Sequence, residues 1–69
     1  MRRYLCRHVI VDDVDMGLCL VHITRDSDVE IIPFERETPS TVYLDGSLVV
    51  NTRHGKLSAL IHNGKPLPV

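Results

Sequence analysis

The sequence predicts an all-β fold of about seven short antiparallel strands, arranged as meanders that close into a small barrel or stack as a sandwich. Nine valines and five isoleucines supply β-branched residues that are typical of strands, and eight leucines add to the aliphatic content. Strong helix formers are scarce, since Ala59 is the only alanine. No window has apolar residues at helical spacing over two turns. Four glycines and four prolines divide the chain into short segments.

Residues 4–11 and 18–24 alternate well enough to form the first two strands, and residues 12–17 form the turn between them. Carboxylates and a glycine in that turn favour a chain reversal. Residues 29–34 form a third strand, and Pro33 places part of this strand at a sheet edge or a bulge. We therefore expect a three-stranded meander over residues 4–35, followed by a polar connection.

Residues 41–69 predict a second meander, of four strands. Asp45 and Gly46 lie between two apolar runs and are expected to form a two-residue turn, because Asp-Gly readily takes the positive φ values of a type I′ turn. Asn63-Gly64 repeats this device. Pro66 and Pro68 would remove the hydrogen-bond donors from one side of the last strand, so this strand should lie at an edge of the sheet.

Length and charge limit the class of protein. The 69 residues give room for one hydrophobic core, so residues 1–69 should form a single small domain. The net charge of −1 argues against a protein that coats a polyanion. No apolar run approaches the ~18 residues of a membrane-spanning helix. The basic N-terminus lacks the apolar stretch of a signal peptide, and two cysteines are too few for a secreted disulfide framework. We expect a cytoplasmic protein, or a mature fragment whose leader was removed, with reduced thiols and no membrane contact.

A cluster in the first hairpin is the candidate metal site. If the first two strands pair symmetrically about Val14, Cys6 faces His22, and His8 joins them on the same face at roughly 5–8 Å. Thiolate and imidazole ligands suit zinc. A register slip of one residue would instead move one strand's side chains to the other face. The alternative is a half-buried face in which the cysteine is a small hydrophobic residue and the histidines lie at the rim.

A disulfide between the two cysteines is not expected. It would require a pairing centred between Asp12 and Asp13, where neither residue favours the turn as glycine or asparagine would. The nearby carboxylates also fail to match a calcium-binding loop, because the glycine and the bidentate glutamate are not at the required positions.

The sequence contains no catalytic triad, no phosphate-binding glycine loop and no paired carboxylates. Cys6 with His8 or His22 is a nominal dyad, but the sequence predicts neither a helix N-terminus that would activate the thiol nor an oxyanion hole. A domain of this size also has little room for a ligand pocket of ~300–1,000 Å³. We expect neither an enzyme nor a cofactor, and no small-molecule substrate.

Aliphatic residues occupy both faces of the predicted strands, and a chain of this size is expected to cover only one of them. One face would hold Val9, Val11, Val21, Ile23, Ile32 and Phe34, and the other, the expected interface, would hold Ile10, Leu18, Leu20 and Ile31. The sequence therefore predicts a non-catalytic β module that acts through protein-protein contact, with a homo-oligomer or a protein partner. The alternatives are a nucleic-acid-binding small barrel that uses Arg2, Arg3 and Arg7, or a Cys/His metal-binding module.

Overall fold

The computed structural model describes residues 2–34 and 41–67, and all regular structure in these residues is β-strand. The all-β prediction is confirmed. No helix in the described residues is long and apolar enough to cross a membrane. The seven strands are β1 (Arg2–Val11), β2 (Val14–Asp15), β3 (Cys19–Ile23), β4 (Val29–Pro33), β5 (Val42–Arg53), β6 (Lys56–His62) and β7 (Lys65–Pro66).

All seven strands belong to one open sheet in the order β4-β3-β1-β5-β6-β7, and β2 pairs with the end of β1. The pairs within β1–β3–β4 and within β5–β6–β7 are antiparallel, as the meanders predicted. β1 and β5 are parallel. The expectation of a wholly antiparallel fold was therefore wrong, because the second meander pairs with the free edge of β1 in the direction that β1 runs.

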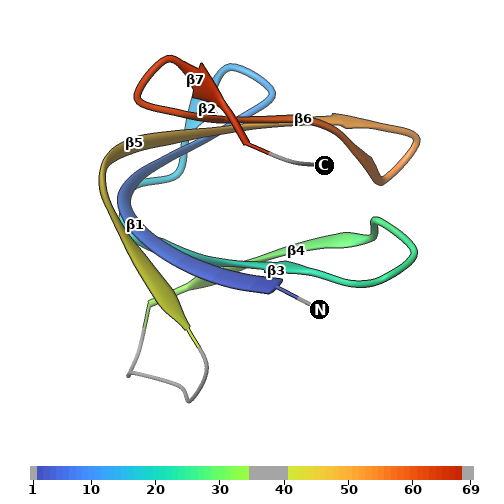
Figure 1. Ribbon diagram of the computed structural model, residues 1–69, viewed down its shortest axis with the longest axis horizontal. Helices are drawn as coiled ribbons and strands as arrows, with labels where there is room; N and C mark the ends of the chain where they lie inside the picture. The colour runs from blue at the N-terminus through green and yellow to red at the C-terminus, as the bar shows by residue number, and fades with distance from the viewer. Residues whose placement is uncertain (1, 35–40, 68–69) are drawn as a thin grey trace.

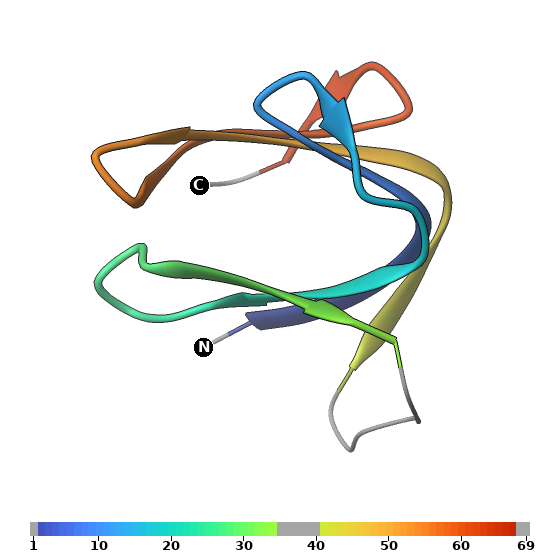
Figure 2. The same cartoon turned by 180° about the vertical axis from the view of Figure 1, so that it is seen from behind.

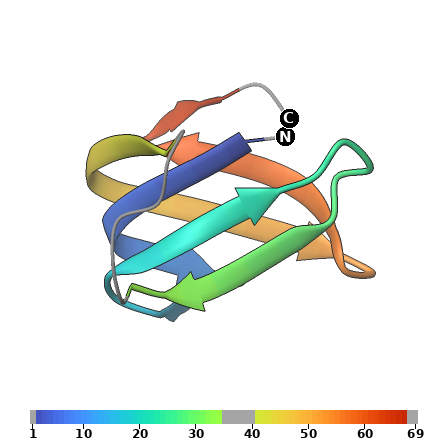
Figure 3. The same cartoon turned by 90° about the horizontal axis from the view of Figure 1, so that it is seen from below.

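The sheet is strongly coiled, because the two long strands β1 and β5 bend in the middle (Figures 1 and 2). A lower layer contains β4, β3 and the first half of β1, and an upper layer contains β2, the second half of β1, most of β5, β6 and β7. Figure 3 shows β1, β3 and β4 side by side from below. The core lies between the layers, and its buried members are Cys6, Val9, Cys19, Val21, Ile23, Leu48, Val50, Leu57 and Leu60.

The first hairpin turns at Asp12 and Asp13, whose φ angles are 47° and 70°. Aspartate tolerates this left-handed region, so the two residues form the tight reversal that was not expected of them. Cys6 consequently lies directly opposite Cys19, and His22 lies opposite Arg3. The predicted register, centred on Val14, was wrong by an odd number of residues, which exchanges the faces of one strand.

Asp45-Gly46 does not form a turn, contrary to the prediction, and lies inside β5. Cys6 pairs with Leu44 but His8 pairs with Ser47, so two residues of β5 lie opposite one residue of β1. This is a β-bulge, in which Gly46 takes the positive φ of 81° that was expected of it in a turn. Asn63-Gly64 does form the tight turn, between β6 and β7.

Prolines mark both free edges of the sheet. Pro33 lies in β4, the outermost strand of the lower layer, which confirms the edge prediction. Pro66 lies in β7 at the other edge, and the next residue, Leu67, donates its N–H to the Leu60 carbonyl at 2.8 Å. This is the predicted arrangement for the last strand. Pro68 lies outside the described residues.

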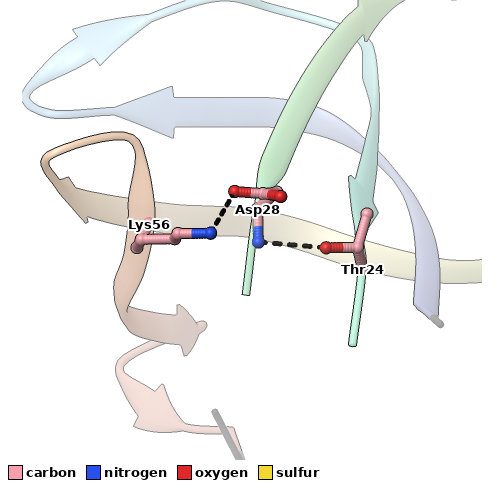
Figure 4. A network of polar contacts seen from close by, with 3 residues as sticks. All are labelled: Thr24, Asp28 and Lys56. Carbon is pink, nitrogen blue, oxygen red and sulfur yellow. Dashed lines mark hydrogen bonds and ion pairs between the residues drawn. The ribbon is translucent and has the colours of Figure 1, made fainter. Parts of the chain in front are cut away.

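At one corner of the molecule the turn between β3 and β4 meets the start of β6, where Asp28 and Lys56 form an isolated bridge (Figure 4). The Leu57 N–H donates to the Ser27 carbonyl at 2.7 Å. Lys56 Nζ donates to Asp28 Oδ1 at 2.6 Å, and the Asp28 N–H donates to Thr24 Oγ1 at 3.1 Å. The sheet is thus fastened at this corner without closing into a barrel.

Candidate functional site

The β5 bulge is held by side chains of the β6–β7 turn. Asn63 Oδ1 accepts a hydrogen bond from the Ser47 N–H at 2.9 Å, and Asn63 Nδ2 donates to the Asp45 carbonyl at 3.1 Å. His62 Nε2 also contacts the Asp45 carbonyl. A Cβ atom on Gly46 would lie 2.1 Å from Asn63 Oδ1, so the clasp requires glycine. We call this set, together with Cys6, the bulge clasp.

Cys6 completes the bulge clasp from inside the molecule. Its side chain is fully buried, and Sγ donates to the Gly46 carbonyl at 3.2 Å. Cys19 is also buried and donates to the Met16 carbonyl at 3.3 Å. Burial, and then the Asp15 carboxylate, raise the pKa of the Cys19 thiol above its usual value. Both cysteines are free thiols and act as hydrogen-bond donors within the core.

The structure does not bring the predicted metal ligands together. Cys6 points into the core, His8 is exposed beside the bulge, and His22 lies on the outer face of β3. The convergence depended on Cys6 facing His22, and the register that the tight Asp12-Asp13 turn imposes places Cys19 there instead. Among the described residues, no group of three or more His, Cys, Asp or Glu side chains could hold a metal ion.

A shallow depression of about 330 Å³ lies on the surface at the bulge, and it is lined by Arg7, His8, Tyr43, Asp45 and Gly46. Arg7 and His8 are consecutive and both exposed, because the regular alternation of β1 is interrupted opposite the bulge and burial resumes at Val9. No described residue forms an ion pair with Arg7. The depression is therefore lined by a cationic residue that forms no ion pair with a described residue, and by a histidine, a tyrosine and an aspartate.

The three arginines predicted to bind nucleic acid do not form one patch. Strand alternation places Arg3 and Arg7 on the outer face of β1 and Arg2 on the opposite side. Of the three, only Arg7 reaches the depression. Tyr43 and Asp45 were not predicted as members of the site, because Asp45 was expected to lie in a turn. A signal was present in Tyr43, one of three aromatic side chains in the sequence.

Two rows of side chains cross the outer face of the lower layer. The register aligns Leu5 of β1, Leu20 of β3 and Ile32 of β4 in an apolar row, and all three side chains are half-buried. The adjacent row contains Arg3, His22 and Glu30 in the same strand order. His22 Nε2 is buried and has no hydrogen-bond partner. We call the two rows together the lower face.

Only Leu20 of the predicted interface residues belongs to the lower face. Leu18 is exposed just before β3, and Ile10 lies on the outer side of the upper layer, opposite Val49. Ile31 is half-buried and packs against the core, on the face of β4 opposite to the lower face. Ile31 pairs with the buried Val21, and the neighbouring Ile32 takes the outward position that had been expected for Ile31.

The carboxylates of the first turn have structural roles. Asp12 accepts hydrogen bonds from the Thr52 N–H at 2.8 Å and from Thr52 Oγ1 at 2.6 Å. These bonds lower the pKa of the Asp12 carboxyl below its usual value. Asp15 Oδ1 accepts from the Gly17 N–H at 2.8 Å. The turn is thereby tied to the end of β5.

The chain matches no protein-family model, and comparison with curated proteins and with solved structures found no similar protein.

Proposed function

We propose that this protein is a non-catalytic β module that associates with a second copy of itself through the lower face. The observation that supports the proposal is the apolar row Leu5, Leu20 and Ile32, which lies next to the polar row Arg3, His22 and Glu30. A contiguous row of aliphatic side chains on an outer sheet face is typical of a contact surface. Sheets commonly stack face to face with such rows interdigitated.

The charges of the lower face favour a second copy as the occupant. Arg3 and Glu30 lie on the two strands that flank β3, about 10 Å apart across two strand spacings. A two-fold axis along β3 would place Arg3 of each copy opposite Glu30 of the other. The same axis would place Leu20 against Leu20, and Leu5 against Ile32. A two-fold contact requires this kind of self-complementarity, in which each surface patch fits its own copy.

The area of the lower face sets the expected strength. Five residues on each of three strands cover roughly 15 by 17 Å, which is smaller than a standard interface of about 800 Å² per partner. We therefore expect a transient dimer with a dissociation constant between about 10 μM and 1 mM. Sedimentation equilibrium over that concentration range measures it directly.

A charge exchange tests the proposed geometry. We expect Arg3→Glu alone and Glu30→Arg alone to be monomeric, because each places like charges across the two-fold axis. An equimolar mixture of the two variants should form a heterodimer, since the glutamate introduced in one chain would then face the arginine introduced in the other. The double variant should dimerise like the original protein. Restored association in the mixture is a result that a merely local role of Arg3 would not produce.

A second pair of variants tests the apolar row. Leu20→Lys would place two ammonium groups against each other on the axis and should abolish the dimer, whereas Ile61→Lys, on the outer side of the upper layer, should leave it intact. Circular dichroism would establish that both variants are folded. A strictly monomeric original protein at about 1 mM, or dimers that survive both Leu20→Lys and the single charge reversals, would overturn the proposal.

A further inference from the structure

The depression at the bulge carries an inference that is separate from the proposed self-association. We infer that it binds a small ligand that carries a phosphate group beside a planar ring and a hydrogen-bond donor, the chemistry of a nucleoside monophosphate. The lining residues offer a complement for each of these groups, and they are held on two paired strands.

Arg7 is the expected partner of the phosphate. Its guanidinium is exposed and forms no ion pair with a described residue, so its fork of N–H donors is available for a bidentate contact. His8, the next residue, lines the same depression and supplies a further donor. Two consecutive side chains can both reach this site because the strand alternation of β1 is interrupted opposite the bulge.

Tyr43 and Asp45 determine what else the ligand must carry. Tyr43 is 54% exposed, so its ring is accessible to a planar group that could stack on it. Asp45 lines the depression and forms no ion pair with Arg7. Because a carboxylate repels a bare anion and accepts hydrogen bonds, it favours a ligand with a hydroxyl or amino group near the phosphate.

The bulge clasp holds the backbone beneath these groups in one conformation. Asn63 binds both sides of Gly46, and Cys6 binds the Gly46 carbonyl from the core. A site on a fixed bulge loses little entropy when a ligand binds. The volume of about 330 Å³ lies at the lower end of the range for ligand pockets and suits a mononucleotide better than a larger ligand.

The experiment is an NMR titration of the isotope-labelled full chain with adenosine 5′-monophosphate, adenosine and inorganic phosphate as separate probes. We expect the monophosphate to shift the amide signals of residues 7–8 and 43–47 with saturation. Adenosine alone and phosphate alone should each bind about tenfold more weakly or worse, because each lacks one of the two groups. Equal binding of all three probes, or shifts that fall elsewhere, would overturn the inference.

Matched variants identify the contacts. Arg7→Gln should weaken monophosphate binding by about tenfold or more, while Arg53→Gln, which removes the same charge from another exposed strand position, should leave it nearly unchanged. Tyr43→Leu should weaken the monophosphate but leave the weak binding of inorganic phosphate unaltered. If Arg53→Gln weakens binding as much as Arg7→Gln, the binding is non-specific attraction to net charge and the inferred site is wrong. The titration can be repeated on the Leu20→Lys variant, which we expect to be monomeric. The test of ligand binding is therefore independent of dimerisation.

Discussion

The coiled sheet is fastened at two places that differ in how they are built. On one side, where β1 and β5 bend, the bulge clasp joins the bulge to the β6–β7 turn through two side chains and a buried thiol. On the other side, the turn between β3 and β4 meets the start of β6 through a backbone hydrogen bond from Leu57 to Ser27 and an ion pair between Lys56 and Asp28 (Figure 4). The side chains of that ion pair are 51% and 57% exposed.

The difference teaches where the curvature of the sheet is stabilised. In the bulge clasp, an added methyl group on Gly46 has no space, and both polar atoms of the Asn63 amide bond the backbone of β5. At the bridge, solvent competes with the ion pair, and exposed pairs of this kind contribute little to stability. We therefore expect substitutions in the bulge clasp to destabilise the fold strongly. Substitutions at the bridge between Asp28 and Lys56 should destabilise it little.

The largest expected effect is that of Gly46→Ala. The substitution forces a side chain into a positive φ and onto Asn63, so we expect about 2–4 kcal/mol of destabilisation from strain and from the lost hydrogen bonds. Gly55→Ala is the matched control, because Gly55 has a similar φ of 78° but nothing within 4 Å of an added Cβ. Its cost should be about 1 kcal/mol. Urea denaturation followed by circular dichroism measures both, and equal costs would mean that the clasp is unimportant.

Asn63→Gly should have the next largest effect. It keeps the positive φ of the turn but removes the bonds to Ser47 and Asp45, at an expected cost of about 1–2 kcal/mol. His54→Gly is the control, since His54 holds the same position before a glycine in the β5–β6 turn and has a φ of 54°. Both variants add a glycine to the unfolded chain, so the difference in their unfolding free energies isolates the side-chain bonds. A His54→Gly cost as large as that of Asn63→Gly would contradict this account.

Lys56→Met should have the smallest effect, because it removes an exposed ion pair and retains most of the side-chain packing. The hydrogen bond to Asp28 raises the pKa of Lys56. A raised pKa means that the pair stabilises the fold below the unfolded-state value of about 10.4 and that this contribution is lost as the pH rises through the folded-state pKa. The original protein and the variant should therefore converge in stability at alkaline pH and at high salt. A thermal-melt difference that persists in about 1 M salt would contradict the prediction.

The sequence predicted the class of fold because composition and alternation are local properties. The edge position of Pro33 and the tight turn at Asn63-Gly64 were predicted correctly. A proline has no N–H donor, and Asn-Gly readily takes positive φ angles, so each is compatible with few positions in a sheet. The pairing between β1 and β5 could not be predicted in this way, because it joins residues about 40 positions apart and leaves no local pattern.

The errors at the candidate sites share one cause. Asp12-Asp13 formed the turn that was expected further along the chain, and Asp45-Gly46 formed a bulge, so the same turn-forming chemistry was used at different places. The first error shifted the register of the first hairpin by an odd number of residues. The second error divided β5, which is one strand, into two. The metal cluster was then lost, and Asp45 moved from a supposed turn to the edge of the depression.

The parallel pairing of β1 with β5 has a consequence for synthesis of the protein. The edge of β1 that β5 covers stays unpaired on the nascent chain until about 40 further residues have been added, which takes about 2–8 s on a ribosome. During this time the backbone N–H and C=O groups on that edge of β1 have no strand partner. An unpaired edge of this kind readily pairs with other chains. Prompt arrival of β5 would be the step that decides between the native molecule and aggregation.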